Sequence, residues 1–542
     1  MSNLVKAVKQ EKQWESKQVN FMGGISYTIN PLDTMKMVTA SSIFGEPQYY
    51  RNGEFAEKYV KDGEYHVHDL MQEYSVLPAE YDKRKTSDIM ESAIDTALSY
   101  DFAAVLDWAV ELRTGFLMRL NPQIIMVRAA IHPDRSAYTE AHPGEFDRIN
   151  QIVMSRADES ASQLAYYLYK NKQKKQVPGI LKKSWAKKLS GLSAEQVNKY
   201  KNTGIGMIDT VRVCHANSSA IDELMRTGTV KVEETKATWE TLRAAGKTWE
   251  EILLTINMGH MARLRNLRGI FTEIDNLELC QEQMELLKKG VKSGKQFPFR
   301  YYTARKMIEA ADKIHHKQLI LDTLEECMDL ARENMPKLPG RTICLSDNSG
   351  SAWGSFTSEY GKVTIADIGN LSSIVTAANS DEGFVGVFGD RLTICPVSKR
   401  EGVLKQAREV GAVGNKVGMS TENGIWLFFK DAIEQRGHWD NIVIYSDMQA
   451  GHGGLYGIGD AYVKAGYGWK GHYIDVAKLI AKYREINPKV NVTCVQTAGY
   501  DNILVPEYGY RTNFAYGWTG KELLFLDTMR KFWDEKDAEA SN

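Results

Sequence analysis

The sequence predicts a multidomain protein, in which an all-α segment of stacked helical repeats precedes an α/β segment with a doubly wound, mostly parallel sheet. Two observations lead to this fold class. Before about residue 335, apolar residues recur at spacings of three and four, the period of a helix with one buried face. After Pro339-Gly340, short apolar runs alternate with helical stretches, which is typical of strand–helix–strand units.

The helical segment is expected at 21–338, after an N-terminal tail at 1–20. Its periodicity is clearest at 91–120, 151–169 and 248–266. Because a lone pair of helices cannot bury its apolar face, this long helical stretch predicts pairs of helices stacked on one another. The last apolar stripe before the boundary consists of Leu321, Leu324, Met328, Ala331 and Met335.

The α/β segment is expected at 339–542, beyond the prolines that interrupt the last helix. Its strands and helices alternate along the chain, and ligands of such sheets bind at the carboxyl ends of the strands. The predicted strands are 342–345, a hairpin of 384–388 with 392–394, 442–445 and 490–495. The predicted helices are 371–378, 425–435, 474–485 and 522–533.

The composition is that of a globular protein without a strong charge bias. The 542 residues are 43% hydrophobic and carry a net charge of −1, which argues against a protein coated in positive charge but leaves room for a local basic patch. Six scattered cysteines without a CxxC pair indicate neither a disulfide framework nor a zinc knuckle. The polar N-terminus lacks a signal-peptide pattern, and we expect a cytoplasmic protein without a membrane segment.

A candidate metal site follows the first strand of the α/β segment, where Asp347, Ser349 and Ser351 form a D-x-S-x-S pattern. Thr421 precedes a predicted helix and Asp447 follows the strand 442–445, which places both at the same edge of the sheet. Carboxylate and hydroxyl oxygens suit a hard divalent cation, most naturally Mg²⁺. The alternative is that these residues only cap helices and turns, as Asp and Ser often do.

Clusters of cations mark a candidate nucleic-acid interface in the helical segment. The stretch 160–194 contains no acidic residue and carries several lysines close to the aromatic side chains of Tyr166, Tyr167 and Trp185. Cations interleaved with aromatic rings favour phosphate neutralisation and base stacking, whereas the alternative is a solvated lysine face. The predicted RNA-binding residues are Lys170, Lys172, Lys174, Lys175, Lys199, Lys201, Arg212, His215, Arg263, Arg265, Arg268 and Arg300. Arginines at 263–268 would look the same on a structural helix paired to carboxylates.

These motifs resemble two known modules. Asp347, Ser349, Ser351, Thr421 and Asp447 are similar to the metal-ion-dependent adhesion site of von Willebrand factor A domains. The helical segment resembles the TROVE module of the Ro autoantigen family, especially its bacterial members. That second resemblance rests on Gly45 to Tyr50, Lys199-Tyr200-Lys201 with Arg212 to His215, Leu264 to Leu267, and Phe297 to Ala304. Cys395-Pro396-Val397 also fits the A-like domain of that family.

The resemblance implies that HEAT-like helical repeats close into a monomeric ring, bridged by an A-like domain that binds Mg²⁺. It implies a non-catalytic ribonucleoprotein scaffold for RNA quality control, which holds single-stranded 3′ ends of misfolded RNAs in the ring and a Y RNA outside. An exoribonuclease such as polynucleotide phosphorylase is the implied protein partner. Two departures from the family are Ala352-Trp353 after the metal motif and Ala216-Asn217-Ser218 after His215. The first bears on the partner of the metal and the second on Y RNA binding.

Two other functions are compatible with the residues. Asp347 and Asp447 would also be expected in a metal-dependent hydrolase or nuclease, although no general base is evident beside them. The glycine-rich stretch 451–457 follows a strand but lacks the lysine of a nucleotide-binding P-loop. Alternatively, the chain is a protein-interaction module of the A-domain type whose lysines are merely solvated. We expect a protein that is not an enzyme.

Overall fold

The computed structural model describes most of the two predicted segments. The described residues are 16–19, 25–28, 31–40, 86–171, 176–201, 206–354, 356–358, 361–418, 424–446, 468–469, 473–474, 476–497, 508–516 and 520–541. Of the residues singled out above, Lys172, Lys174, Lys175, Thr421, Asp447 and the stretches 45–50 and 451–457 lie outside this part of the chain.

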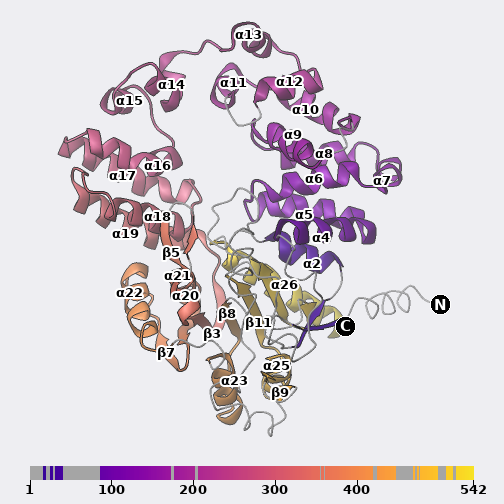
Figure 1. The fold of residues 1–542 in the computed structure, drawn as a ribbon, viewed down its shortest axis with the longest axis vertical. Helices are drawn as coiled ribbons and strands as arrows, with labels where there is room; N and C mark the ends of the chain where they lie inside the picture. Colours follow the sequence, from indigo (N-terminus) through magenta and orange to yellow (C-terminus); the bar gives the residue numbers. More distant parts are fainter. Residues whose placement is uncertain are drawn as a thin grey trace, which may run out of the picture.

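Helices follow one another along a curved path, which we call the helical arch (α2 to α19; Figure 1). It rises from α2 and α4, passes through α13 at the top of the view, and descends to α18 and α19. Its helices are α2 (Pro31–Ala40), α4 (Thr86–Tyr100), α5 (Phe102–Thr114), α6 (Asn121–Ile131), α7 (Arg135–Ala141), α8 (Glu145–Val153), α9 (Glu159–Lys170), α10 (Gly179–Ser190), α11 (Ala194–Tyr200), α12 (Met207–Cys214), α13 (Ser219–Thr227), α14 (Trp239–Ala244), α15 (Trp249–Thr255), α16 (His260–Glu273), α17 (Leu277–Ser293), α18 (Pro298–Glu309) and α19 (Lys317–Ala331).

Short polar residues begin several of the helices within the stretches of helical periodicity noted above. Asp101 begins α5 by accepting a hydrogen bond from the Ala104 backbone N–H at 2.9 Å, so that 91–120 is shared by α4 and α5. Thr248 and Glu251 form a capping box at the start of α15, which is separate from α16. Because side-chain oxygens satisfy the free amides of a helix start, such residues favour several short helices over one long one.

A seven-stranded mixed sheet forms the centre of the second part, which we call the sheet domain (β3 to α26). The strand order is β12-β13-β11-β8-β3-β6-β7, with antiparallel edge strands β7 and β12 and parallel strands between them. The strands are β3 (Leu338–Asp347), β6 (Ser380–Phe388), β7 (Leu392–Pro396), β8 (Asn441–Ser446), β11 (Asn491–Gln496), β12 (Tyr508–Gly509) and β13 (Thr512–Tyr516). The helices are α20 (Gly350–Gly354), α21 (Ile365–Ala378), α22 (Val403–Gly414), α23 (Gly424–Glu434), α25 (Val476–Arg484) and α26 (Glu522–Ser541). Two-stranded pairs add β1 (Ser16–Val19) with β2 (Ile25–Thr28), β4 (Phe356–Ser358) with β5 (Gly361–Thr364), and β9 (Gly468–Trp469) with β10 (Tyr473–Ile474).

The chain reverses its direction across the sheet between β3 and β8. From β3 it crosses to β6 through α21, and from β8 it crosses the other way to β11 through α25. Right-handed crossovers in opposite directions place these two helices on opposite faces of the sheet. The carboxyl ends of β3 and β8 therefore flank the position where ligands of doubly wound sheets bind.

Both ends of the helical arch meet the sheet domain. At one end, the Val403 backbone N–H of α22 donates to Asp329 Oδ1 of α19 at 2.9 Å. At the other, α2 packs against β13, and Lys521 Nζ donates to the Leu117 carbonyl at 3.1 Å. One continuous hydrophobic core includes side chains from both parts, such as Leu324 and Ile343. The sheet domain thus closes the helical arch into a ring.

These observations confirm the predicted fold class, with several elements that the pattern missed. The hairpin of β6 with β7 and the helices α21, α23, α25 and α26 lie close to the predicted ranges. Helix α22 and strand β13 were not predicted, because their apolar patterns are short or mixed and do not by themselves distinguish a helix from a strand. Within the described part of the chain, no helix combines the length and the apolar character needed to cross a membrane.

Candidate metal centre and nucleic-acid interface

The D-x-S-x-S loop begins where β3 ends, in the middle of the sheet. Asp347 is 1% exposed, and its Oδ1 accepts the Ser349 backbone N–H at 2.9 Å. Its Oδ2 accepts the hydroxyl of Ser446, the last residue of β8, at 2.8 Å. These two neutral donors hold the buried carboxylate at the point where the chain reverses across the sheet.

A buried amide network fixes the shape of this loop from the α21 side. Asn348 and Asn370 exchange two hydrogen bonds of 2.9 Å, and the Ser346 hydroxyl donates to Asn370 Oδ1 at 2.8 Å. All three side chains are nearly or fully buried. Buried polar groups that satisfy one another in this way rigidify a structure, so the backbone of the loop is held before any ligand binds.

The described oxygens fit a hard divalent cation. Asp347 supplies a carboxylate and Ser349 a hydroxyl, while Ser351 lies next along the chain in α20. No cluster of three or more His, Cys, Asp or Glu side chains suited to a metal occurs among the described residues, so a site here depends on serine oxygens. Thr421 and Asp447, the other two predicted ligands, lie outside the described residues.

Four of the predicted RNA-binding residues lie on or just after α11 and α12. The side chains of Lys199, Arg212 and His215 are exposed, and that of Lys201 is half-buried. Lys199 Nζ lies 5.3 Å from the centre of the Tyr200 ring, and His215 ends α12 with a φ of 57°. None of these four side chains makes an ion pair with another described residue.

The arginines of α16 divide into two exposed side chains and one buried side chain. Arg265 and Arg268 are exposed and make no ion pair with another described residue. Arg263 is only 4% exposed, and its Nε donates to Gln283 Oε1 of α17 at 2.9 Å. Burial also lowers the pKa of Arg263. Arg263 therefore helps to join α16 to α17 and does not present its guanidinium to solvent.

The lysine-rich stretch around α9 and α10 differs from the predicted pattern of cations with stacking aromatics. Trp185 is fully buried, and its Nε1 donates to Gln163 Oε1 at 2.7 Å. Tyr167 is also buried, and the Tyr166 hydroxyl donates to Glu91 at 2.9 Å. Lys170 forms an ion pair with Glu91 at 2.8 Å. These rings belong to the core because they face the neighbouring helices, and Lys170 is engaged within the protein.

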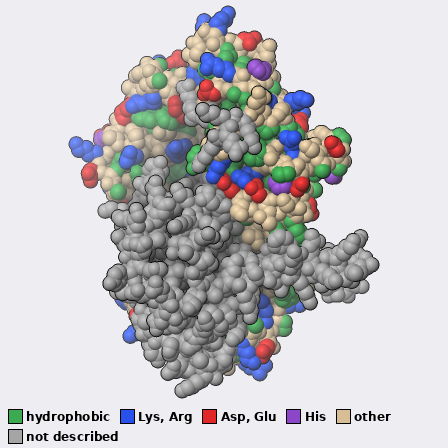
Figure 2. All heavy atoms as spheres, turned by 45° about the vertical axis from the view of Figure 1, so that its right-hand side comes forward, with side chains coloured by type: hydrophobic (Ala, Val, Ile, Leu, Met, Phe, Trp, Pro, Cys, Tyr) green, Lys and Arg blue, Asp and Glu red, His purple; other side chains and the backbone are tan. Residues whose placement is uncertain are grey.

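Arg300, in the first turn of α18, is half-buried and has interactions within the protein. Figure 2 shows lysine and arginine side chains scattered over the helical arch among acidic ones, without a continuous basic field on that face. The exposed cations of α11, α12 and α16 are therefore local features, in agreement with the net charge of −1.

Comparison with known proteins gives a structural match alone. No model of a known protein family matches the chain, and no curated protein matches its sequence. Among solved structures, the crystal structure of the Ro (RSR) protein of Deinococcus radiodurans superposes with a TM-score of 0.56 at 14% identity. The match covers 81% of this chain and 93% of that one. The chain therefore has the fold of this Ro protein, a ring of helices joined to a von Willebrand factor A-like domain.

Proposed function

We propose that this protein is a non-catalytic RNA-binding scaffold of the Ro type, acting in RNA quality control or degradation. Its ring would hold single-stranded 3′ ends of misfolded or structured RNAs, and its outer surface a small noncoding RNA of the Y type. The observation that carries this proposal is the similarity to a Ro protein over 81% of the chain. Without it, the exposed cations would be compatible with a solvated surface.

The unpaired cations supply the physical argument for RNA. Lys199, Arg212, Arg265 and Arg268 are exposed without a carboxylate partner among the described residues, whereas Lys170 already pairs with Glu91. A cation without an internal partner is free to neutralise a phosphate and release its counterion. Helices α11 and α12 lie on one limb of the arch and α16 on the other, so an RNA strand between the limbs would have cation-bearing helices on both sides (Figure 1).

The first prediction concerns these cations. Replacing Lys199, Arg212 and Arg265 by alanine should weaken binding of a single-stranded oligoribonucleotide in a filter assay. For three lost phosphate contacts, the slope of log affinity against log salt should become shallower by about 2. A control variant replaces Lys292, Lys405 and Lys489 by alanine. It removes the same charge from lysines that already lie near carboxylates. Wild-type affinity in the first variant, or affinity indifferent to salt, would count against RNA binding.

We also propose that Asp347, Ser349, Ser351, Thr421 and Asp447 hold Mg²⁺ in the sheet domain. When bound, the ion would offer an open coordination position to a carboxylate of a protein partner, such as the exoribonuclease polynucleotide phosphorylase. The protein's own contribution is the prearranged loop, in which Ser446 and the Ser349 amide orient the Asp347 carboxylate.

The second prediction tests this metal site. Mg²⁺ should raise the melting temperature of the wild type, because a ligand in hundredfold excess over its Kd stabilises the native state by about 2.7 kcal/mol. Asp347→Asn should remove this rise, and the exposed control Asp431→Asn should retain it. An equal rise in all three proteins would exclude the site.

RNA incubated with the protein and Mg²⁺ should keep its length on a gel, and cleavage lost in Asp347→Asn would instead identify a nuclease.

A further inference from the structure

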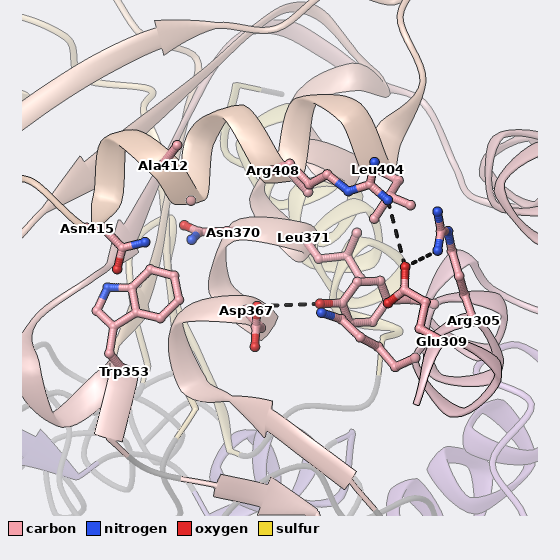
Figure 3. A pocket seen from close by; sticks show the side chains of 14 residues that line it. Arg305, Glu309, Trp353, Asp367, Asn370, Leu371, Leu404, Arg408, Ala412 and Asn415 are labelled. Carbon is pink, nitrogen blue, oxygen red and sulfur yellow. Dashed lines mark hydrogen bonds and ion pairs between the residues drawn. The ribbon is translucent and has the colours of Figure 1, made fainter. Parts of the chain in front are cut away.

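A cavity of about 300 Å³ lies where the helical arch meets the sheet domain (Figure 3). Its walls are α18 of the arch and the helices α20, α21 and α22 of the sheet domain. A volume of this size is at the lower end of the range for small-molecule sites, enough for one nucleotide-sized ligand. Nothing in the proposed binding of RNA by α11, α12 and α16 uses this cavity.

The two ends of the cavity differ in chemistry. At one end lie the carboxamides of Asn370 and Asn415 with the indole of Trp353, and at the other lie Arg305 and Arg408 with Glu309 (Figure 3). Leu371 and Leu404 from α21 and α22 add apolar surface to the same wall. Because the Asn370 carboxamide is already bonded to Asn348, the exposed Asn415 and the Trp353 indole would meet a planar hydrogen-bonding group of a ligand, while an anionic group would meet the other end.

Both carboxylates that line the cavity are already engaged within the protein, and the cations that line it are more numerous. Asp367 belongs to the capping box of α21, and its Oδ1 accepts the Tyr302 hydroxyl at 3.4 Å. Glu309 pairs with Arg305 and, at 3.9 Å, with Arg408. Lys306, the third cation of the wall, is exposed and lies over the Tyr302 ring without a carboxylate partner among the described residues. Arg305 is also paired with Glu325 of α19 at 3.6 Å, so the exposed Lys306 and Arg408 are the cations of the wall that remain to meet an anion.

Two buried donors in the wall lack a hydrogen-bond partner within the described structure: Trp353 Nε1 and Arg305 Nε. Arg305 is 7% exposed, so its unmet donor is costly. The amide end is also held in place, because Asn370 belongs to the network beneath the D-x-S-x-S loop and the Trp353 backbone N–H donates to the Ser349 carbonyl. The Trp353 Nε1 donor at this end is available to an acceptor on a bound ligand.

We propose that this cavity binds a nucleoside monophosphate group, with the base at the amide end and the phosphate at Lys306 and Arg408. An apolar ligand would desolvate the cations without compensation, and inorganic phosphate alone would leave the amide end unused. The group belongs either to a free nucleotide or to an unpaired terminal residue of an RNA. Only the second source rests on the proposed function.

The test is calorimetric titration of the full chain with AMP and, separately, with inorganic phosphate at fixed ionic strength. AMP should bind, and phosphate should bind at least about tenfold more weakly. Arg408→Ala should weaken AMP binding by about tenfold, the worth of one charge-assisted hydrogen bond. Arg408 is 57% exposed, so this variant should fold, and Arg400→Ala is the matched exposed control outside the cavity. Trp353→Phe, which removes only the indole N–H donor and part of the ring, should weaken AMP but not phosphate.

No binding of AMP, equal affinities for AMP and phosphate, or an unchanged affinity in Arg408→Ala would each overturn the proposal. Titration with a single-stranded oligoribonucleotide then separates the two sources. If Arg408→Ala weakens AMP and the RNA, the group is an RNA end; if it weakens AMP alone, the ligand is a free nucleotide. A chain that binds AMP but no RNA refutes the proposed function and leaves this inference standing. A chain that binds RNA but no AMP refutes this inference and leaves the proposed function standing.

Discussion

At the scale of single residues, His260 shows how packing in the helical arch sets the charge of a side chain. Its Nε2 lies 2.7 Å from the Tyr301 hydroxyl of α18, and its Nδ1 is buried without a hydrogen-bond partner in the described part of the chain. The ring lies against Gly290 of α17, where an added Cβ would come within 2.4 Å of Nδ1. Burial, with a smaller contribution from Arg263, lowers the pKa of His260 to about 4.

The third prediction follows from this lowered pKa. The unfolded chain takes up a proton on His260 below its ordinary pKa of 6.5, whereas the folded protein resists protonation down to about 4. Stability contributed by the neutral ring is therefore present at neutral pH and declines as the pH falls through this window, by on the order of 2 kcal/mol. In denaturant unfolding, the free energy of unfolding of His260→Gln should fall less between pH 7 and pH 4.5 than that of the wild type.

The exposed His438 offers the matched substitution His438→Gln for comparison. An identical pH profile for His260→Gln and the wild type would show that His260 does not contribute to it. The arginines of α16 also differ in their surroundings. Arg263 turns toward Gln283 and is buried, while Arg265 and Arg268 remain exposed for an external anion.

At the scale of elements, helix starts determine how the arch is divided. Ser218, Thr248 and Asn276 each accept a backbone N–H at the start of a helix, as Asp101 does for α5. Each such residue fixes the point where a new helix begins. The result is a series of short helices that pack on their neighbours in the sequence, which is the physical basis of a curved repeat structure.

The fourth prediction concerns the start of α5. Asp101→Ala removes the oxygen that accepts the Ala104 amide, and loss of such a cap costs about 1 kcal/mol. Amide hydrogen exchange in α5 should therefore become several-fold faster, as measured by mass spectrometry of its peptides. Asp107→Ala removes the same charge from the exposed middle of the helix and should leave protection intact. Equal exchange in the two variants would mean that the cap does not determine the local stability of α5.

At the scale of the whole molecule, the sheet domain performs two tasks. It supplies the loop that holds Asp347, and it joins α2 to α19 through contacts at both ends of the arch. Segments more than 400 positions apart in the chain meet where Lys521 donates to the Leu117 carbonyl. Leu117 has a φ of 55°, a left-handed conformation that the surrounding contacts must stabilise.

The fifth prediction tests this closure. Lys521→Met keeps the apolar stem of a side chain that is 8% exposed but removes its donor, at a cost of roughly 1–3 kcal/mol. Hydrogen exchange should increase by about tenfold or more in α2 and around Leu117, and remain unchanged in α16 and α17. Lys531→Met, on the exposed side of α26, provides the control. Unchanged exchange near Leu117 would show that other contacts suffice to close the ring.

The sequence by itself determined the features that depend on near neighbours. Alternating apolar residues identified β3, β6, β7, β8 and β11, and the D-x-S-x-S pattern lies at the end of a buried strand as expected. Pro336 and Pro339-Gly340 marked the place where helices give way to strands. Periodicity and proline act within a few residues, so a single sequence is enough to reveal them.

Only the tertiary structure decided which polar and aromatic groups are exposed. Trp185 and Arg263 have the sequence surroundings of surface residues, yet both are buried because α8, α9 and α17 cover them. Likewise, the cavity between the arch and the sheet domain assembles Arg305, Trp353 and Arg408 from three separate helices. Burial is a property of segments brought together from far along the chain, and local patterns carry no record of which segments those are.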